Sequence, residues 1–136
     1  MKIWIFMGST SDRDIMAAAE DVLKKESVPY ETYIHSAHRE PEKIRELMAK
    51  AKDEGVMAII AGAGFAAHLP GFIASLTDIP VLGVPIPAST LGGIDSLLSI
   101  VQMPSGVPVA TFGIGKSGAK NAALFASRLY HQIEKK

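Results

Sequence analysis

Short apolar runs alternate with helical patterns along the whole chain, and this alternation limits the possible folds more than any other feature. The first run, Ile3–Met7, is continuous and apolar, as expected of a strand that is covered on both faces. The other predicted strands are Tyr30–His35, Met57–Ala61, Pro80–Val84 and Val107–Phe112. Strands that alternate with helices predict a parallel sheet with helices on both of its faces.

Helical periodicity fills the segments between these runs. Asp12 is expected to cap the first helix. Pro41 suits the first turn of the second helix, and Gly55 is well placed to close it. The apolar positions at helical spacing are Ile15, Ala19, Val22 and Leu23 in the first helix and Ile44, Leu47, Met48 and Ala51 in the second; further helices are expected near Leu69–Leu76, Asp95–Gln102 and Lys116–Lys136.

This order of elements predicts an α/β chain with a flavodoxin-like, three-layer, doubly wound fold. We expect a five-stranded parallel sheet in the strand order 2-1-3-4-5, formed by a single domain over residues 1–136. In such sheets ligands bind beyond the carboxyl ends of the strands. The loops after the first three strands are therefore the expected place for chemistry.

Charge and cysteine content exclude several classes of function. The 14 Lys and Arg residues balance the 14 Asp and Glu residues, which gives no support for a nucleic-acid partner or an anionic membrane surface. The absence of cysteine excludes disulfides, thiolate nucleophiles and Cys-ligated metals. Four histidines without an H-x-x-x-H pair predict no metal site. No apolar run reaches membrane-spanning length without Gly or Pro, so a cytoplasmic protein is expected.

The segment from residue 79 to residue 115 carries almost no charge. Asp95 is the only charged residue among these 37. The outer surface of a small monomer must stay wetted, so we expect much of this segment to be buried against other subunits of a homo-oligomer. The alternative is that the segment forms only inner strands and one buried helix.

The loop after the first predicted strand combines a glycine with Ser9, Ser11 and Asp12. Hydroxyl groups and a helix N-terminus together can bind an anion. The loop is neither a Walker loop nor a G-x-G-x-x-G dinucleotide loop. The alternative is a capping motif, in which Ser11 and Asp12 cap the helix and bind nothing. Asp12 repels phosphate, so any ligand contact it makes is expected to be with a sugar hydroxyl.

The loop after the second predicted strand contains Ser36, His38 and Arg39. Arg39 can bind a phosphate with two parallel hydrogen bonds, and His38 can exchange a proton near neutral pH. The alternative gives Ser36 a capping role, leaves Arg39 on the surface and assigns His38 a structural hydrogen bond. His35 is expected to end the second strand, and His131 to lie in solvent on the last helix.

The loop after the third predicted strand is rich in small residues, from Ala61 to Gly71. Small side chains let a flat ring approach backbone groups closely, and His68 could face such a ring. The alternative is tight helix–strand packing with His68 as a buried, hydrogen-bonded histidine.

Six segments resemble the PurE family of purine biosynthesis, and more closely its microbial branch, the 5-(carboxyamino)imidazole ribonucleotide mutases. They are GSTSD, SAHREP, AGAGFAAHLPG, PVLGVP, GIDSLLSIVQMPSGVPVAT and the stretch from Gly118 to Leu124. The resemblance covers nearly the whole chain in the right order. The AAHLPG segment points away from the animal-type branch, which uses free carbon dioxide directly.

The resemblance implies an ATP-independent isomerase. Family members move a carboxylate from the exocyclic nitrogen of an aminoimidazole ribonucleotide to ring carbon C4, by decarboxylation and recarboxylation, without metal, nucleotide or organic cofactor. The resemblance makes His38 the general acid and base, with His68 beside it in the catalytic site. The substrate-binding positions it implies are Ser9, Ser11, Asp12, Ser36, Arg39, Gly62, Ala63, Gly64, Ala66, Ala67 and Leu69. It also implies a homo-oligomer, an octamer.

Three positions beside these residues depart from the family pattern. Phe65 stands where the family usually has glycine, Arg13 replaces a frequent Trp, and Glu40 replaces a frequent Thr. The Phe65 ring is expected to narrow the slot for the substrate, and Glu40 to add negative charge near the phosphate site. Two other functions stay open from the residues alone: a related carboxylase that acts on another nucleotide, and a non-catalytic phosphosugar-binding module.

Overall fold

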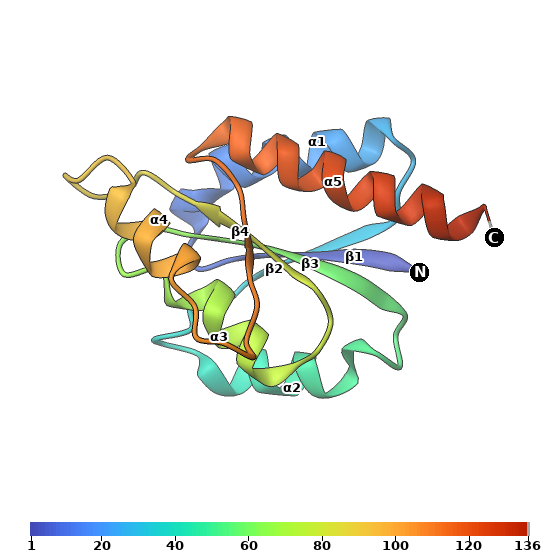
Figure 1. Ribbon diagram of the computed structural model, residues 1–136, viewed down its shortest axis with the longest axis horizontal. Coiled ribbons are helices and arrows are strands. Elements are labelled where there is room, and N and C mark those ends of the chain that lie inside the picture. Colours follow the sequence, from blue (N-terminus) through green and yellow to red (C-terminus); the bar gives the residue numbers. More distant parts are fainter. Residues whose placement is uncertain (136) are drawn as a thin grey trace.

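A parallel sheet forms the centre of the computed structural model, which describes residues 1–135 (Figure 1). Within those residues the sheet has five strands in the order β2-β1-β3-β4-β5, which confirms the predicted fold class and strand order. The strands are β1 (Lys2–Met7), β2 (Tyr30–Ile34), β3 (Val56–Ala63), β4 (Val81–Pro85) and β5 (Ala110–Thr111).

The helices cover both faces of the sheet (Figure 1). They are α1 (Arg13–Lys25), α2 (Pro41–Ala51), α3 (His68–Leu76), α4 (Ile94–Val101) and α5 (Lys116–Glu134), with a short 3-10 turn, η1 (Thr10–Asp12), before α1. In Figure 1, α1 and α5 lie above the sheet and α2 and α3 below it. The fourth helix, α4, packs against β4, β5 and α3.

The molecule has one hydrophobic core on each face of the sheet, and successive side chains of β1 point alternately into the two cores. Ile3, Ile5 and Met7 pack into the core under α1 and α5, whereas Trp4 and Phe6 point into the core under α2 and α3. All five side chains are fully buried. Successive side chains of a strand point to opposite faces of the sheet, so a continuous apolar run is what a strand covered on both sides requires.

The strand register brings the site loops together. Met7, the last residue of β1, lies opposite Ile34 of β2 and Gly62 of β3. The loops that follow β1, β2 and β3 therefore leave the sheet side by side at its carboxyl edge. The N–H of His35, the first residue after β2, donates to the carbonyl of Met7 across 3.0 Å and extends this alignment by one step.

Some local expectations were wrong. The fifth strand is only two residues long, because Pro108 has no N–H to donate and ladder pairing is confined to Ala110 and Thr111. Asp12 occupies the N-cap position of α1 but makes no capping hydrogen bond with its side chain. Gly55 does not close α2; it adopts a left-handed conformation (φ 78°) in the turn that leads into β3.

The last helix differs from its prediction at its end and in one side chain. It ends at Glu134, and Lys136 lies outside the described residues. His131 is not simply in solvent, because its Nε2 donates to the carbonyl of Glu26 across 2.9 Å and ties α5 to the end of α1. None of the helices in residues 1–135 is long and apolar enough to cross a membrane.

Candidate active site

A cavity of about 550 Å³ lies at the carboxyl edge of the sheet. Its walls come from the loops after β1, β2 and β3, with one residue from the loop after β4. The lining residues are Gly8, Ser9, Ser11, Asp12, Ser36, Ala37, His38, Arg39, Ala63, Gly64, Phe65, Ala66, His68, Leu69 and Ala88. This is the position expected for a ligand site in a doubly wound sheet.

The hydroxyl groups of the first loop are held at the cavity by a local turn. Ser9 caps η1, since its Oγ accepts the N–H of Ser11 at 3.2 Å. The two Oγ atoms lie 3.0 Å apart and share a hydrogen bond. Ser9, rather than Ser11 or Asp12, therefore provides the cap. Both hydroxyls also line the cavity, so capping does not remove them from ligand contact.

Asp12 brings a buried carboxyl group to the wall of the cavity. Its exposed fraction is 7%, and no ion pair among residues 1–135 includes it. Burial raises the pKa of this carboxyl, while hydrogen bonds from the backbone of Ser9 and Gly8 act in the opposite direction. An acceptor held in this way suits a ligand hydroxyl better than a phosphate.

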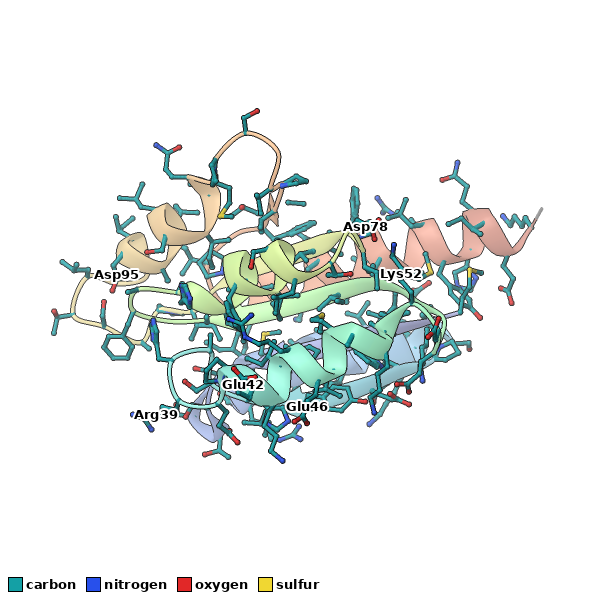
Figure 2. All side chains as sticks on the ribbon, turned by 90° about the horizontal axis from the view of Figure 1, so that it is seen from below. Arg39, Glu42, Glu46, Lys52, Asp78 and Asp95 are labelled. Atoms are coloured by element: carbon teal, nitrogen blue, oxygen red, sulfur yellow. The ribbon has the colours of Figure 1, made fainter. Side chains whose placement is uncertain are left out.

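The second loop forms a compact turn that presents His38 and Arg39. The Oγ of Ser36 accepts the N–H of Arg39 at 3.3 Å, and the carbonyl of Ser36 accepts the N–H of Glu40 at 2.7 Å. Ser36 thus stabilises this turn and also lines the cavity, whereas the N-cap position of α2 belongs to Glu40. Figure 2 shows Arg39 on this turn ahead of α2, with its side chain extending outward from the ribbon. Its guanidinium is free to turn onto a bound anion.

The two histidines of the cavity stack on each other. The rings of His38 and His68 lie 4.9 Å apart, centroid to centroid, with 11° between their planes. Phe72 also stacks with His68, with 5.4 Å between ring centroids, and the guanidinium of Arg45 lies 5.3 Å from the Phe72 ring centroid. Partial burial lowers the pKa of His68, and charge on His38 lowers it further. His68 is therefore held in its neutral form at neutral pH.

The third loop is fixed by close packing at glycine. A Cβ on Gly64 would lie 2.8 Å from the Cβ of Ala88 and 3.2 Å from the carbonyl oxygen of Ile86, so only glycine fits there. The carbonyl of Gly64 also accepts the N–H of Ala67 at 3.0 Å. Phe65, which lies between Gly64 and Ala67, has a positive φ of 53° and is 60% exposed.

Two of the predicted binding residues do not line the cavity. Gly62 lies beneath α1, where an added Cβ would clash with the Met16 sulfur. Ala67 is buried, 3% exposed, at the N-terminus of α3. Gly62 has no side chain and Ala67 has only a methyl group, so helix and strand pack closely at both positions.

Four lining residues were not among the predicted site residues: Gly8, Ala37, Phe65 and Ala88. The first three adjoin predicted residues in the same loops, so adjacency alone could have found them. Ala88 follows β4, which pairs with β3, and its loop therefore leaves the sheet at the same edge. The sheet order was the signal that could have found Ala88.

The site combines three kinds of chemical group. Hydroxyls and a guanidinium can bind an anion, small apolar side chains leave room for a flat ring, and two imidazoles can handle protons. Within residues 1–135 no three His, Asp or Glu side chains gather in a way that could hold a metal ion.

Fold and site together define an α/β protein of the doubly wound class with a small-molecule site where its strands end. Residues 2–136 match the model of the AIR carboxylase family. The chain belongs to that family.

Curated relatives and a solved structure agree with this assignment. The N5-carboxyaminoimidazole ribonucleotide mutase of Saccharolobus solfataricus is 56% identical over 128 residues, which cover 94% of this chain and 80% of the relative. The enzyme of the same name from Pyrococcus horikoshii is also 56% identical, over 98% of this chain and 77% of the relative. The crystal structure of Treponema denticola PurE superposes with a TM-score of 0.85 at 28% identity, covering 96% of this chain and 80% of that one.

Proposed function

We propose that this protein is an isomerase of purine biosynthesis that converts 5-(carboxyamino)imidazole ribonucleotide to 4-carboxy-5-aminoimidazole ribonucleotide. The observation that carries the proposal is the stacked pair His38 and His68, set in one cavity with Ser9, Asp12 and Arg39. The substrate requires a phosphate anchor, a sugar contact, a slot for a flat ring and a proton carrier. The relatives at 56% identity bear the name of this activity.

The proposed binding mode assigns each part of the substrate to one group of residues. Arg39, with the hydroxyls of Ser9, Ser11 and Ser36, holds the phosphate through charge-assisted hydrogen bonds. The carboxylate of Asp12 accepts a hydrogen bond from a ribose hydroxyl. The imidazole lies against the small residues of the third loop, Ala63, Gly64 and Ala66, with Leu69 behind them.

The proposed reaction balances without an added reagent. The bond between the exocyclic nitrogen and the carboxylate carbon breaks, its electron pair stays on the nitrogen, and carbon dioxide is released. The nitrogen gains one proton. Ring carbon C4, which the amino group makes electron-rich, then attacks the carbon dioxide, and His38 removes the proton left on C4. One proton is taken up and one is released, so a single acid–base residue can serve both steps.

His68 supports this role through its neutral form. Since its pKa is lowered, the ring beside His38 carries no competing positive charge at neutral pH. His38 can then gain and lose a proton without repulsion from its stacked neighbour.

Product identification tests the proposed function. Purified protein is incubated, without ATP, with substrate that carries ¹³C in its carboxylate, and the products are followed by ¹³C NMR. The proposal predicts a carbon-bound carboxylate at C4. A related carboxylase would instead turn over only a different heteroaromatic nucleotide offered in parallel. A binding module would bind the ribonucleotide with neither carboxylate transfer nor exchange of the C4 proton, and either result would refute the proposal.

A homo-oligomer is part of the same proposal. Around α4 the residues Leu91, Ile94, Leu98 and Val101 are 63%, 52%, 55% and 47% exposed. Four large apolar side chains on one helix and the turn before it are more than a small monomer usually leaves in water. They lie in the charge-poor segment of residues 79–115. We propose that this face is covered by other copies of the chain, with an octamer as the assembly that the resemblance implies; a cytoplasmic location stays a prediction.

A further inference from the structure

Phe65 is the one departure from the family pattern that lines the cavity. Arg13 turns along α1, where its Nη1 donates to Glu20 across 3.0 Å. The carboxylate of Glu40 turns to His35, with 3.4 Å between Oε1 and Nδ1. Of the two expected effects, only the narrowing of the slot by Phe65 applies to the cavity. The negative charge of Glu40 does not, because Glu40 does not line the cavity.

Two features of Phe65 are unfavourable for the folded chain alone. Its φ of 53° lies in the left-handed region, which is a genuine outlier for a bulky side chain. The residue is also 60% exposed, so burial of its side chain stabilises the folded chain little. Backbone strain and an exposed aromatic ring at the same residue, on the wall of a cavity, point to contact with a ligand.

The backbone on either side of Phe65 has little freedom to relax. Gly64 is wedged against Ala88 and Ile86, and its carbonyl holds the N–H of Ala67. The turn therefore sets the Cα–Cβ direction of Phe65, while rotation about its side-chain bonds can still swing the ring. An aromatic ring mounted on a fixed turn at a cavity wall can cover a flat ligand.

We propose that the Phe65 ring closes over the bound imidazole and retains the carbon dioxide released there. This inference rests on the proposed function. Carbon dioxide is small, apolar and held by no charge, so an apolar cover slows its escape from the cavity of this chain before C4 attacks it. The same cover excludes water, in which carbon dioxide would be lost as bicarbonate.

The test measures how much of the original carboxylate survives the transfer. Substrate labelled with ¹³C in its carboxylate reacts in a buffer of unlabelled bicarbonate, and NMR gives the labelled fraction of the C4 carboxylate and the amount of decarboxylated aminoimidazole. A reaction without enzyme supplies the background. For Phe65→Gly we expect the decarboxylated by-product per turnover to rise at least about threefold and label retention to fall. Phe65→Leu, which keeps apolar bulk, should lie between Phe65→Gly and wild type.

Two further variants serve as a substitute for Phe65→Gly and as a control. Phe65→Asn also removes the ring but tolerates the left-handed backbone, so it replaces Phe65→Gly if that variant fails to fold. Phe125→Ala removes an aromatic ring that is 47% exposed on α5 and lines no part of the cavity; it should match wild type. Wild-type retention in Phe65→Gly and Phe65→Asn would overturn the inference while leaving the proposed function intact. No C4-carboxylated product from the wild-type protein would overturn both.

Discussion

The imidazole rings of His38 and His68 lie nearly parallel, with 4.9 Å between their centroids. Partial burial lowers the pKa of His68, and repulsion between two protonated rings at this separation lowers it further. Because the two residues leave the sheet from different strands, β2 and β3, the pair depends on the strand order. Predictions about either ring are therefore predictions about the site as a whole.

Acid should destabilise the protein through His68. Its pKa in the folded chain lies below the ordinary 6.5, so between these two values the unfolded chain binds a proton that the folded chain does not. The free energy of unfolding then rises with pH in this window: the penalty is fully present below the folded pKa and is gone above the unfolded one. We expect the thermal midpoint to fall between about pH 7.5 and pH 5, and less steeply in His68→Asn. Equal slopes in the two proteins would contradict the assignment.

Phe72 should act as a positioning residue for His68. Its ring stacks 5.4 Å from the imidazole, so Phe72→Ala is expected to lower kcat/KM by about tenfold. Truncation of this half-buried ring should also cost about 1–3 kcal/mol in the free energy of unfolding. The pH–rate profile separates the two effects, because loss of stability alone would leave its inflections in place. Phe72→Tyr keeps the ring and should restore both rate and profile; failure to restore them would argue against stacking.

The Asp12 carboxylate should strengthen substrate binding while lowering the free energy of unfolding. Burial raises the pKa of its carboxyl, so the free energy of unfolding falls as pH rises from the ordinary value through the raised one. Asp12→Asn removes this cost and is expected to gain about 0.5–1 kcal/mol near neutral pH by urea unfolding. The same change should raise KM, since the amide is a weaker acceptor for a hydroxyl. A variant that is less stable yet binds normally would refute both parts.

Charge placed on α4 should break the assembly. Leu98 is 55% exposed on its outer face, and a carboxylate there would be buried without a partner in any interface that covers this face. Sedimentation velocity is expected to show an assembly for the wild-type chain and smaller species for Leu98→Glu. Ser75→Glu, at an exposed position on α3, adds the same charge elsewhere and should leave the assembly unchanged. A wild-type chain that sediments as a monomer would contradict the proposal.

The sheet could be predicted from the sequence because its strands are buried on both faces. A short apolar run such as Ile3–Met7, followed by turn residues and a helical pattern, indicates a buried strand, and the order 2-1-3-4-5 is a common one for small doubly wound sheets. The fifth strand was overestimated because apolar residues around Pro108 look like a strand, although proline limits the ladder to Ala110 and Thr111.

The site could be predicted at the level of loops, but not of every side chain. The sequence predicts His38, His68 and Arg39 from their side-chain chemistry and from loops that follow neighbouring strands, and all three line the cavity. Gly62 and Ala67 could not be separated from Gly64 and Ala66 by residue type, since small residues serve packing and ligand contact equally well. The left-handed backbone of Phe65 lies next to the close packing of Gly64 against Ala88, and sequence patterns encode neither the backbone conformation nor this contact between loops.

The most direct test of the account is the turnover of His38→Asn with the carboxylated aminoimidazole ribonucleotide. Asparagine keeps similar size and polarity but cannot exchange a proton near neutral pH, so the fold and substrate affinity should persist, as checked by circular dichroism and equilibrium binding. The account predicts that kcat falls by about 10²–10⁴-fold. A folded His38→Asn protein that forms the C4 carboxylate at close to the wild-type rate would contradict it.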